Sequence, residues 1–146
     1  MSPDELRARS RRLLEEVFNQ GDLAVAEELI SPAYALHDIR AGAAPTGIDG
    51  LRQYVRMLRL AFPDINGYLE DVIADGDRVV QRISVSGTHL GAYLGTPPSG
   101  RRVAYDLIHI DRFGPDGRIV ESWCIDDQLG LLQQIGAIAA PVQTGV

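Results

Sequence analysis

The sequence predicts an α+β domain in which three N-terminal helices pack on one face of a curved antiparallel sheet. Two observations support this fold class. Apolar residues repeat at helical spacing through residues 2–61 and alternate with a period of two from residue 66 onward. Gly and Asp residues that favour turns separate the alternating segments, so neighbouring segments can pair as hairpins. A length of 146 residues fits one domain with one core, spanning residues 1–146.

The first helix is predicted from its own opening residues. Ser2 and Glu5 have the spacing of a capping box, in which each side chain bonds the backbone amide of the other residue. Apolar residues at helical spacing continue the helix over residues 2–19, and Gly21 ends it.

Two more helices follow before the alternating segments. Asp22 is a candidate N-cap for a second helix that runs through Ile30. A third helix is predicted over residues 49–61 and ends ahead of Pro63, because the residue before a proline disfavours helical backbone. Between these two helices, residues 34–38 are predicted to form a short extended segment.

Strands are predicted over residues 66–74, 78–88, 101–113 and 118–126, followed by a short C-terminal helix over residues 129–135. A tight turn over residues 114–117 sets the register of the last two strands and puts His109 opposite Ser122. The same register puts Leu107 opposite Cys124, so that His109 and Cys124 are only diagonal neighbours.

Alternation assigns each residue of these two strands to a face. The face toward the helices is predicted to carry Tyr105, Leu107, His109, Asp111, Val120, Ser122, Cys124 and Asp126. The opposite face is predicted to carry Asp106, Ile108, Ile110, Glu121, Trp123 and Ile125. The second set contains four large apolar side chains that no helix covers, and such a patch predicts a homodimer through the outer sheet face.

The composition narrows the possible functions. A net charge of −6 disfavours nucleic-acid binding, which needs a basic face. No apolar run approaches the roughly 18–20 residues that span a bilayer, and the N-terminus lacks the layout of a signal peptide, so a cytoplasmic protein is expected. One cysteine excludes an intrachain disulfide, and the three histidines lack metal-ligand spacing. No nucleotide-binding motif is present, and we expect neither metal nor cofactor.

Three motifs carry a resemblance to a known family. They are Asn-Gln-Gly-Asp at residues 19–22, Gly-Thr-Pro-Pro-Ser-Gly-Arg at residues 95–101 and Leu-Gly-Leu-Leu-Gln-Gln at residues 129–134. Together they resemble the SnoaL-like polyketide cyclases over nearly the whole chain. The resemblance implies a cone-shaped fold of the nuclear-transport-factor-2 and ketosteroid-isomerase type, with the helices on the concave face of the sheet. It also implies a cofactor-independent cyclase or isomerase that closes a ring on a small, apolar, polyketide-derived substrate.

The resemblance implies a role for His109, and the sequence departs from the family at Cys124. In the family, a histidine at the place of His109 lines the pocket and helps to polarise the substrate; otherwise it would be a core histidine. The family more often has an Asp at the place of Cys124, and that carboxylate is the acid/base of a ring-closing aldol step. A mostly protonated thiol cannot do this work, so Cys124 is predicted to be a small buried lining residue. Its presence favours an epoxide-opening or pericyclic ring closure over an aldol.

Two carboxylates are candidates for the missing acid/base. Asp126 is on the same predicted face as Cys124, or else it caps the last helix. Asp38 is near the place where ketosteroid-isomerase-like relatives keep a catalytic carboxylate, or else it is a surface turn residue. Apolar neighbours would make Asp38 a better base. Alternation allows only one of His37 and Asp38 into the pocket, so His37 is an alternative lining residue.

The remaining predicted substrate-binding residues are Tyr93, Tyr105, Leu107 and Ser122. Tyr93 is in the glycine-hinged loop and is a candidate donor at the pocket mouth, or else a packing aromatic. The alternative function is a non-catalytic small-molecule-binding or association module, because one fold serves many functions.

Overall fold

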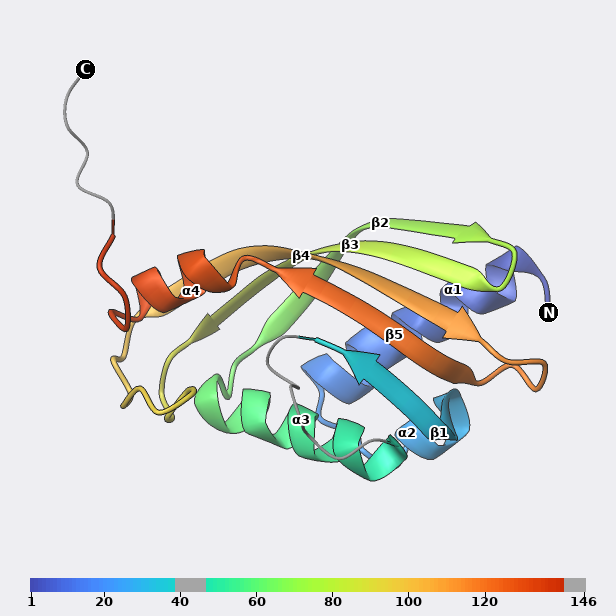
Figure 1. The fold of residues 1–146 in the computed structure, drawn as a ribbon, viewed down its shortest axis with the longest axis horizontal. Helices are drawn as coiled ribbons and strands as arrows, with labels where there is room; N and C mark the ends of the chain where they lie inside the picture. The colour runs from blue at the N-terminus through green and yellow to red at the C-terminus, as the bar shows by residue number, and fades with distance from the viewer. Residues whose placement is uncertain (39–46, 141–146) are drawn as a thin grey trace, which may run out of the picture.

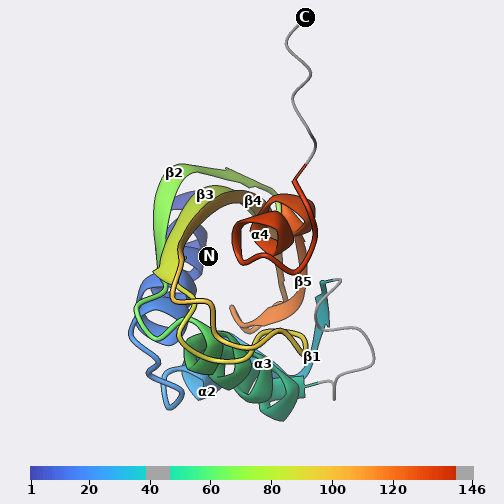
Figure 2. The same ribbon diagram turned by 90° about the vertical axis from the view of Figure 1, so that its left-hand side faces the viewer.

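The computed structural model describes residues 1–38 and 47–140 (Figure 1). Its helices are α1 (Pro3–Arg12), which continues as the π-helix η1 (Leu13–Asn19), then α2 (Ala26–Leu29), α3 (Gly47–Ala61) and α4 (Gln128–Gln134). Its strands are β1 (Ile30–His37), β2 (Asn66–Asp75), β3 (Arg78–Thr88), β4 (Arg102–Phe113) and β5 (Ile119–Asp126). The predicted α+β fold is confirmed: the sheet curls around the interior, and α3 covers its open side (Figure 2).

The sheet has the strand order β1-β5-β4-β3-β2. Three of its four strand pairs are antiparallel, as predicted, but β1 pairs with β5 in parallel. The predicted second helix is also shorter than residues 22–30. The backbone turns from helical to extended at Ile30, which pairs with Ile119 of β5. A β-branched residue that gains a strand partner favours the extended conformation, so the chain leaves the helix there.

The first helix begins as predicted and then widens. The capping box is present, with Ser2 and Glu5 bonding each other's backbone amides at 3.2 and 2.6 Å. From Leu13 the helix becomes a π-helix, in which residues five apart lie on one face. Leu13 and Phe18 therefore both line the interior cavity described below.

The register between β4 and β5 differs from the prediction. The pairing lies two residues from the predicted register. Phe113 pairs with Ile119, one residue beyond the prediction, and a bulge between Arg112 and Phe113 adds the second residue, so His109 lies directly opposite Cys124. Leu107 lies opposite Asp126, not opposite Cys124. Because side chains alternate with a period of two, a shift of two residues leaves the predicted faces of Ser122, Cys124 and Asp126 unchanged. The predicted inner face is therefore confirmed at these positions although the predicted pairs are wrong. At the bulge the prediction fails, because the buried residue that pairs with Phe113 is Ile119 and not Val120.

Two hydrophobic clusters fill the interior between the sheet and the helices. One gathers around α1, α2 and β1, and the other around α3, β3, β4 and α4. The loop after β3 packs tightly on the end of α3. Gly91 lies so close to the carbonyl oxygen of Leu60 that any side chain at this position would collide with it. Within the described residues, no helix is long and apolar enough to cross a membrane.

Candidate active site

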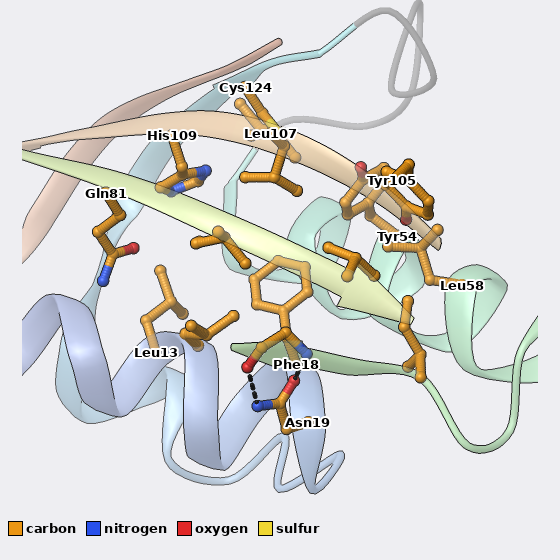
Figure 3. Close-up of a pocket in the computed structure, with 16 residues that line it drawn as sticks. Leu13, Phe18, Asn19, Tyr54, Leu58, Gln81, Tyr105, Leu107, His109 and Cys124 are labelled. Atoms are coloured by element: carbon orange, nitrogen blue, oxygen red, sulfur yellow. Dashed lines mark hydrogen bonds between the residues drawn. The ribbon is translucent and has the colours of Figure 1, made fainter. Parts of the chain in front are cut away.

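A cavity lies between the concave face of the sheet and the helices (Figure 3). The space inside it is about 610 Å³ when the part open to solvent at its mouth is counted. Most of its walls are aliphatic or aromatic side chains. Its polar lining residues are Asn19, Tyr54, Gln81, Tyr105, His109 and Cys124. Figure 3 shows Gln81 and His109 at one end of this group, and Tyr54 and Tyr105 at the other.

His109 lines the cavity with its ring held from behind by Asp111. The distance from His109 Nε2 to Asp111 Oδ1 is 2.8 Å, and the Asp111 side chain is fully buried. Two hydroxyls hold the same carboxylate: Ser122 donates to Oδ1 at 2.6 Å and Ser10 donates to Oδ2 at 2.7 Å. The pair is therefore oriented by α1, β4 and β5 together, and both carboxylate oxygens accept hydrogen bonds.

The environment keeps both partners of this pair charged. Burial alone would lower the pKa of His109, but the Asp111 charge and hydrogen bond outweigh burial and raise the pKa well above its ordinary value. Burial alone would raise the pKa of Asp111, but the His109 charge and the hydroxyl hydrogen bonds hold the pKa below its ordinary value. At neutral pH the cavity wall therefore presents an imidazolium whose charge is balanced behind it.

A row of polar side chains crosses the sheet at this level. Gln81 of β3 pairs with His109 of β4, and His109 pairs with Cys124 of β5. All three residues line the cavity. Directly opposed residues have Cβ atoms about 4.5–5.5 Å apart, so Cys124 is closer to His109 than the predicted diagonal arrangement allowed.

Asp38 lies beside this row on the inner face. It follows β1 two residues after Leu36, which lines the cavity, and it is 9% exposed. His37 pairs with Trp123 of β5, so Asp38 is at the level of Cys124. The Tyr54 hydroxyl donates to Asp38 Oδ2 at 2.9 Å. A buried carboxylate thus reaches the cavity wall through Tyr54, and Asp38 is not a surface turn residue.

His37 does not line the cavity, which corrects the alternative that placed it there. Its side chain is half exposed, and Nε2 lies 2.9 Å from Glu121 Oε2 on the outer face. The ring stacks on Trp123 with centroids 5.5 Å apart. Alternation along β1 turns Leu36 and Asp38 inward and therefore turns His37 outward.

Asp126 and Tyr93 lie near each other but are not among the lining residues that the structure describes. Asp126 accepts two hydrogen bonds from the Gln128 side-chain amide at 3.1 Å. It does not cap α4, because the N-cap is Asp127. Tyr93 is fully buried, and its hydroxyl donates to Gln128 at 2.8 Å. Tyr93 therefore packs in the core and is not a donor at the cavity mouth.

The other predicted substrate-binding residues divide between the wall and the layer behind it. Tyr105, Leu107 and Cys124 line the cavity. Ser122 is fully buried and is not in the described lining, but it bonds Asp111 and so supports His109 from behind.

Four residues of this arrangement were not selected from the sequence: Ser10, Tyr54, Gln81 and Asp111. Ser10 had a detectable signal, because it lies on the apolar stripe of the first helix between Leu6 and Leu13. Asp111 had one too, since alternation places it on the same face as His109. Gln81 and Tyr54 had signals of the same kind: alternation places Gln81 on the face of Val79 and Ile83, and helical spacing places Tyr54 on the apolar stripe of the third helix.

The chemistry available here is proton donation and charge stabilisation. Across residues 1–38 and 47–140, no three His, Cys, Asp or Glu side chains group closely enough to hold a metal ion. An imidazolium in an apolar wall can donate a hydrogen bond to an oxygen that becomes negative during a reaction. A buried carboxylate on the same face can accept or return a proton.

Comparison with known proteins agrees with this fold and geometry. The family model described as SnoaL-like polyketide cyclase matches residues 8–135. Nogalonic acid methyl ester cyclase of Streptomyces nogalater is 30% identical over 121 residues, covering 82% of this chain and 89% of that protein. Aklanonic acid methyl ester cyclase DauD of Streptomyces sp. strain C5 is 28% identical over 132 residues, covering 86% of this chain and 78% of that protein.

The solved structure of TsrD from Streptomyces laurentii superposes with a TM-score of 0.85 at 30% sequence identity, covering 94% of this chain and 99% of that chain. The family match and these similarities extend over most of the chain, including every strand of the sheet and the residues of the cavity wall. The protein therefore belongs to the SnoaL-like polyketide cyclase family of enzymes.

Proposed function

We propose that this protein closes a ring on a small, mostly apolar polyketide-derived substrate by acid/base catalysis in the cavity, without a cofactor. The observation that carries the proposal is the His109–Asp111 ion pair in the wall of an otherwise apolar cavity. The substrate class is supported by two relatives whose names state that they cyclise methyl esters, of nogalonic acid and of aklanonic acid.

In this proposal His109 is the acid. Its imidazolium hydrogen-bonds the substrate carbonyl or epoxide oxygen and donates a proton to it as the ring closes. Asp111 keeps the ring charged and oriented but does not contact the substrate. Ser10 and Ser122 hold Asp111, and Asp111 holds the His109 ring. The imidazolium therefore needs no reorganisation when negative charge develops on the substrate oxygen.

Asp38 is the proposed base of the ring closure. The family position of the catalytic Asp is taken here by Cys124, and Asp38 brings a carboxylate to the same level of the inner face from β1. Tyr54 connects Asp38 to the cavity wall and can pass a proton between them. We favour Asp38 over Asp126, because Asp38 is bonded to the lining residue Tyr54, whereas Asp126 accepts two hydrogen bonds from Gln128, which is not among the described lining residues. With a base supplied by Asp38, an aldol closure becomes possible beside the epoxide-opening and pericyclic ones.

The test is conversion of the two methyl esters named for the relatives. The purified protein is incubated with nogalonic acid methyl ester and with aklanonic acid methyl ester, and the products are separated by chromatography with mass detection. Cyclisation gives an isomer of unchanged mass and altered retention. If the wild-type protein binds both esters and returns them unchanged, the alternative of a non-catalytic binding module is favoured.

The homodimer is also a proposal, supported by the outer face of the sheet. Ile108 and Ile125 are 44% and 78% exposed there, beside the partly exposed Trp123. Such side chains favour contact with a second apolar surface. Light scattering that gives a mass near 15.9 kDa at all micromolar concentrations would rule the dimer out. A cytoplasmic location remains a prediction.

A further inference from the structure

One buried polar group in the cavity wall is not used by the mechanism above. The Gln81 side chain is 2% exposed, and its Nε2 has no hydrogen-bond partner among the described residues. Burying an amide donor without a partner costs free energy, and folded proteins rarely keep such a group. An aliphatic residue at this place would avoid that cost, so the amide needs a partner that arrives from outside the fold.

The position of Gln81 indicates where that partner would lie. Gln81 lines the cavity, and its cross-strand neighbour is His109. Figure 3 shows both side chains extending from the sheet into the same space, at the end away from Tyr54. Leu13 lies close by on the helix side, where it offers no acceptor. A ligand in the cavity is therefore the available source of an acceptor oxygen.

We propose that Gln81 is a specificity residue whose side-chain amide binds a carbonyl or hydroxyl oxygen on the substrate ring system, next to the oxygen bound by His109. This inference rests on the proposed function and adds a requirement on the substrate. The substrate must carry an acceptor oxygen at the end that enters beside β3 and β4. A hydrocarbon of the same shape leaves the amide unpaired and binds more weakly.

Binding of two matched probes tests this without any need for turnover. The ketone 1-tetralone and the hydrocarbon tetralin have the same fused-ring framework and differ by one carbonyl oxygen. Their dissociation constants are measured by NMR titration of the wild-type protein and of Gln81→Leu. We expect the wild-type protein to prefer 1-tetralone, and Gln81→Leu to reduce that preference about five- to tenfold, as for one lost hydrogen bond.

Two controls separate recognition from packing. Ile83→Val trims another lining residue, on the same strand as Gln81, and should change both dissociation constants alike, leaving their ratio unchanged. The melting temperature of Gln81→Leu should equal or exceed that of the wild-type protein, because the unpaired donor is removed while the side-chain volume is nearly kept. A clearly lower melting temperature would mean that the amide has a partner inside the protein, and the proposal would be wrong.

The binding results test the role of Gln81 independently of the proposed function. If the wild-type protein shows no preference for 1-tetralone, or binds neither probe, the role of Gln81 is wrong whatever the catalytic assays give. If Gln81→Leu loses the preference while His109→Gln keeps full cyclase activity, the role of Gln81 holds and the proposed mechanism fails.

Discussion

Two histidine–carboxylate pairs lie on opposite faces of the same sheet, and they have nearly the same geometry. His109 and Asp111 are 2.8 Å apart on the concave face, with side chains that are 10% and 0% exposed. His37 and Glu121 are 2.9 Å apart on the outer face, with side chains that are 50% and 25% exposed. The difference between the pairs is their surroundings and not their contact distance.

The comparison teaches that burial, not proximity, makes such a pair useful for catalysis. Water screens the outer pair, and exposed ion pairs contribute little to stability. The inner pair has left water, so its charges interact strongly and neither partner can be removed without leaving the other uncompensated. The inner pair also has two hydroxyls that fix its carboxylate, and it lines a cavity in which a substrate can reach the imidazolium.

The largest expected effect comes from removing the two histidines separately. His109→Gln should lower turnover of a cyclised substrate by about 10²–10⁴-fold, the usual contribution of a general acid. His37→Gln should leave turnover near the wild-type rate, because His37 lies on the outer face. Steady-state rates of both variants, with melting curves to check folding, measure the contrast. Equal losses in the two variants would remove the distinction between the faces.

Removing the two carboxylates tests the same contrast in stability. Asp111→Asn should lower the free energy of unfolding by about 3–5 kcal/mol, because it leaves a buried imidazolium without its counter-charge. Glu121→Gln should have a smaller effect, since Glu121 is partly exposed and its partners His37 and Arg112 lie with it on the outer face. Urea unfolding followed by circular dichroism measures both changes. A loss in Glu121→Gln as large as that in Asp111→Asn would contradict the argument from burial.

The two candidate bases, Asp38 and Asp126, allow a second comparison, between two carboxylates on the concave side. Asp38→Asn should reduce turnover about 100-fold or more, because it deletes a titratable group that reaches the cavity through Tyr54. Asp126→Asn should cost less, since Asp126 is bonded to Gln128 and does not belong to the described lining. Rates of the two variants under identical conditions rank them. The reverse ranking would move the base to Asp126.

The stability of the inner pair should depend on pH in a defined window. The pKa of His109 is raised from 6.5, so its contribution is complete below pH 6.5 and is lost as the pH rises toward the raised pKa. The pKa of Asp111 is lowered from 3.8, so its contribution is complete above pH 3.8 and is lost as the pH falls toward the lowered pKa. Unfolding free energies of the wild-type protein and of His37→Gln should fall in parallel above about pH 6.5. A wild-type stability that rises from neutral to alkaline pH would show that His109 is not charged in the folded protein.

The smallest effect is expected at Cys124, the neighbour of His109 in the polar row. Cys124→Ser exchanges a small side chain for another of similar size, so most activity should remain. Because Cys124 lies directly opposite His109, a reactive thiol must be tested separately. Near neutral pH, iodoacetamide should label Cys124 slowly. Stoichiometric labelling together with loss of activity in Cys124→Ser would make the thiol the reactive group and would replace the proposed acid/base pair.

Much of this site was predictable because alternation along a strand is a property of the local backbone. The predicted bounds of β3 agree with the structure at both ends, and the inner face of β4 and β5 is the predicted one except at Val120, beside the bulge. The pairing itself was predicted wrongly by two residues, because one residue is added at the turn and one at the bulge beside Phe113, and the alternation shows neither. The same limit applied at β1, where alternation allowed either His37 or Asp38 inside and only the parallel pairing with β5 selected Asp38.

The sequence by itself determined the α+β class, the order of the helices and strands, the faces of the last two strands and the family. Only the tertiary structure decided that His109 faces Cys124, that Asp111 is its counter-ion and that Ser10 holds Asp111 from a helix 101 residues away in the chain. Hydrophobic periodicity depends on neighbours within one element, so a sequence displays it directly. Hydrogen bonds between distant segments depend on how those segments pack, and packing exists only in the folded chain.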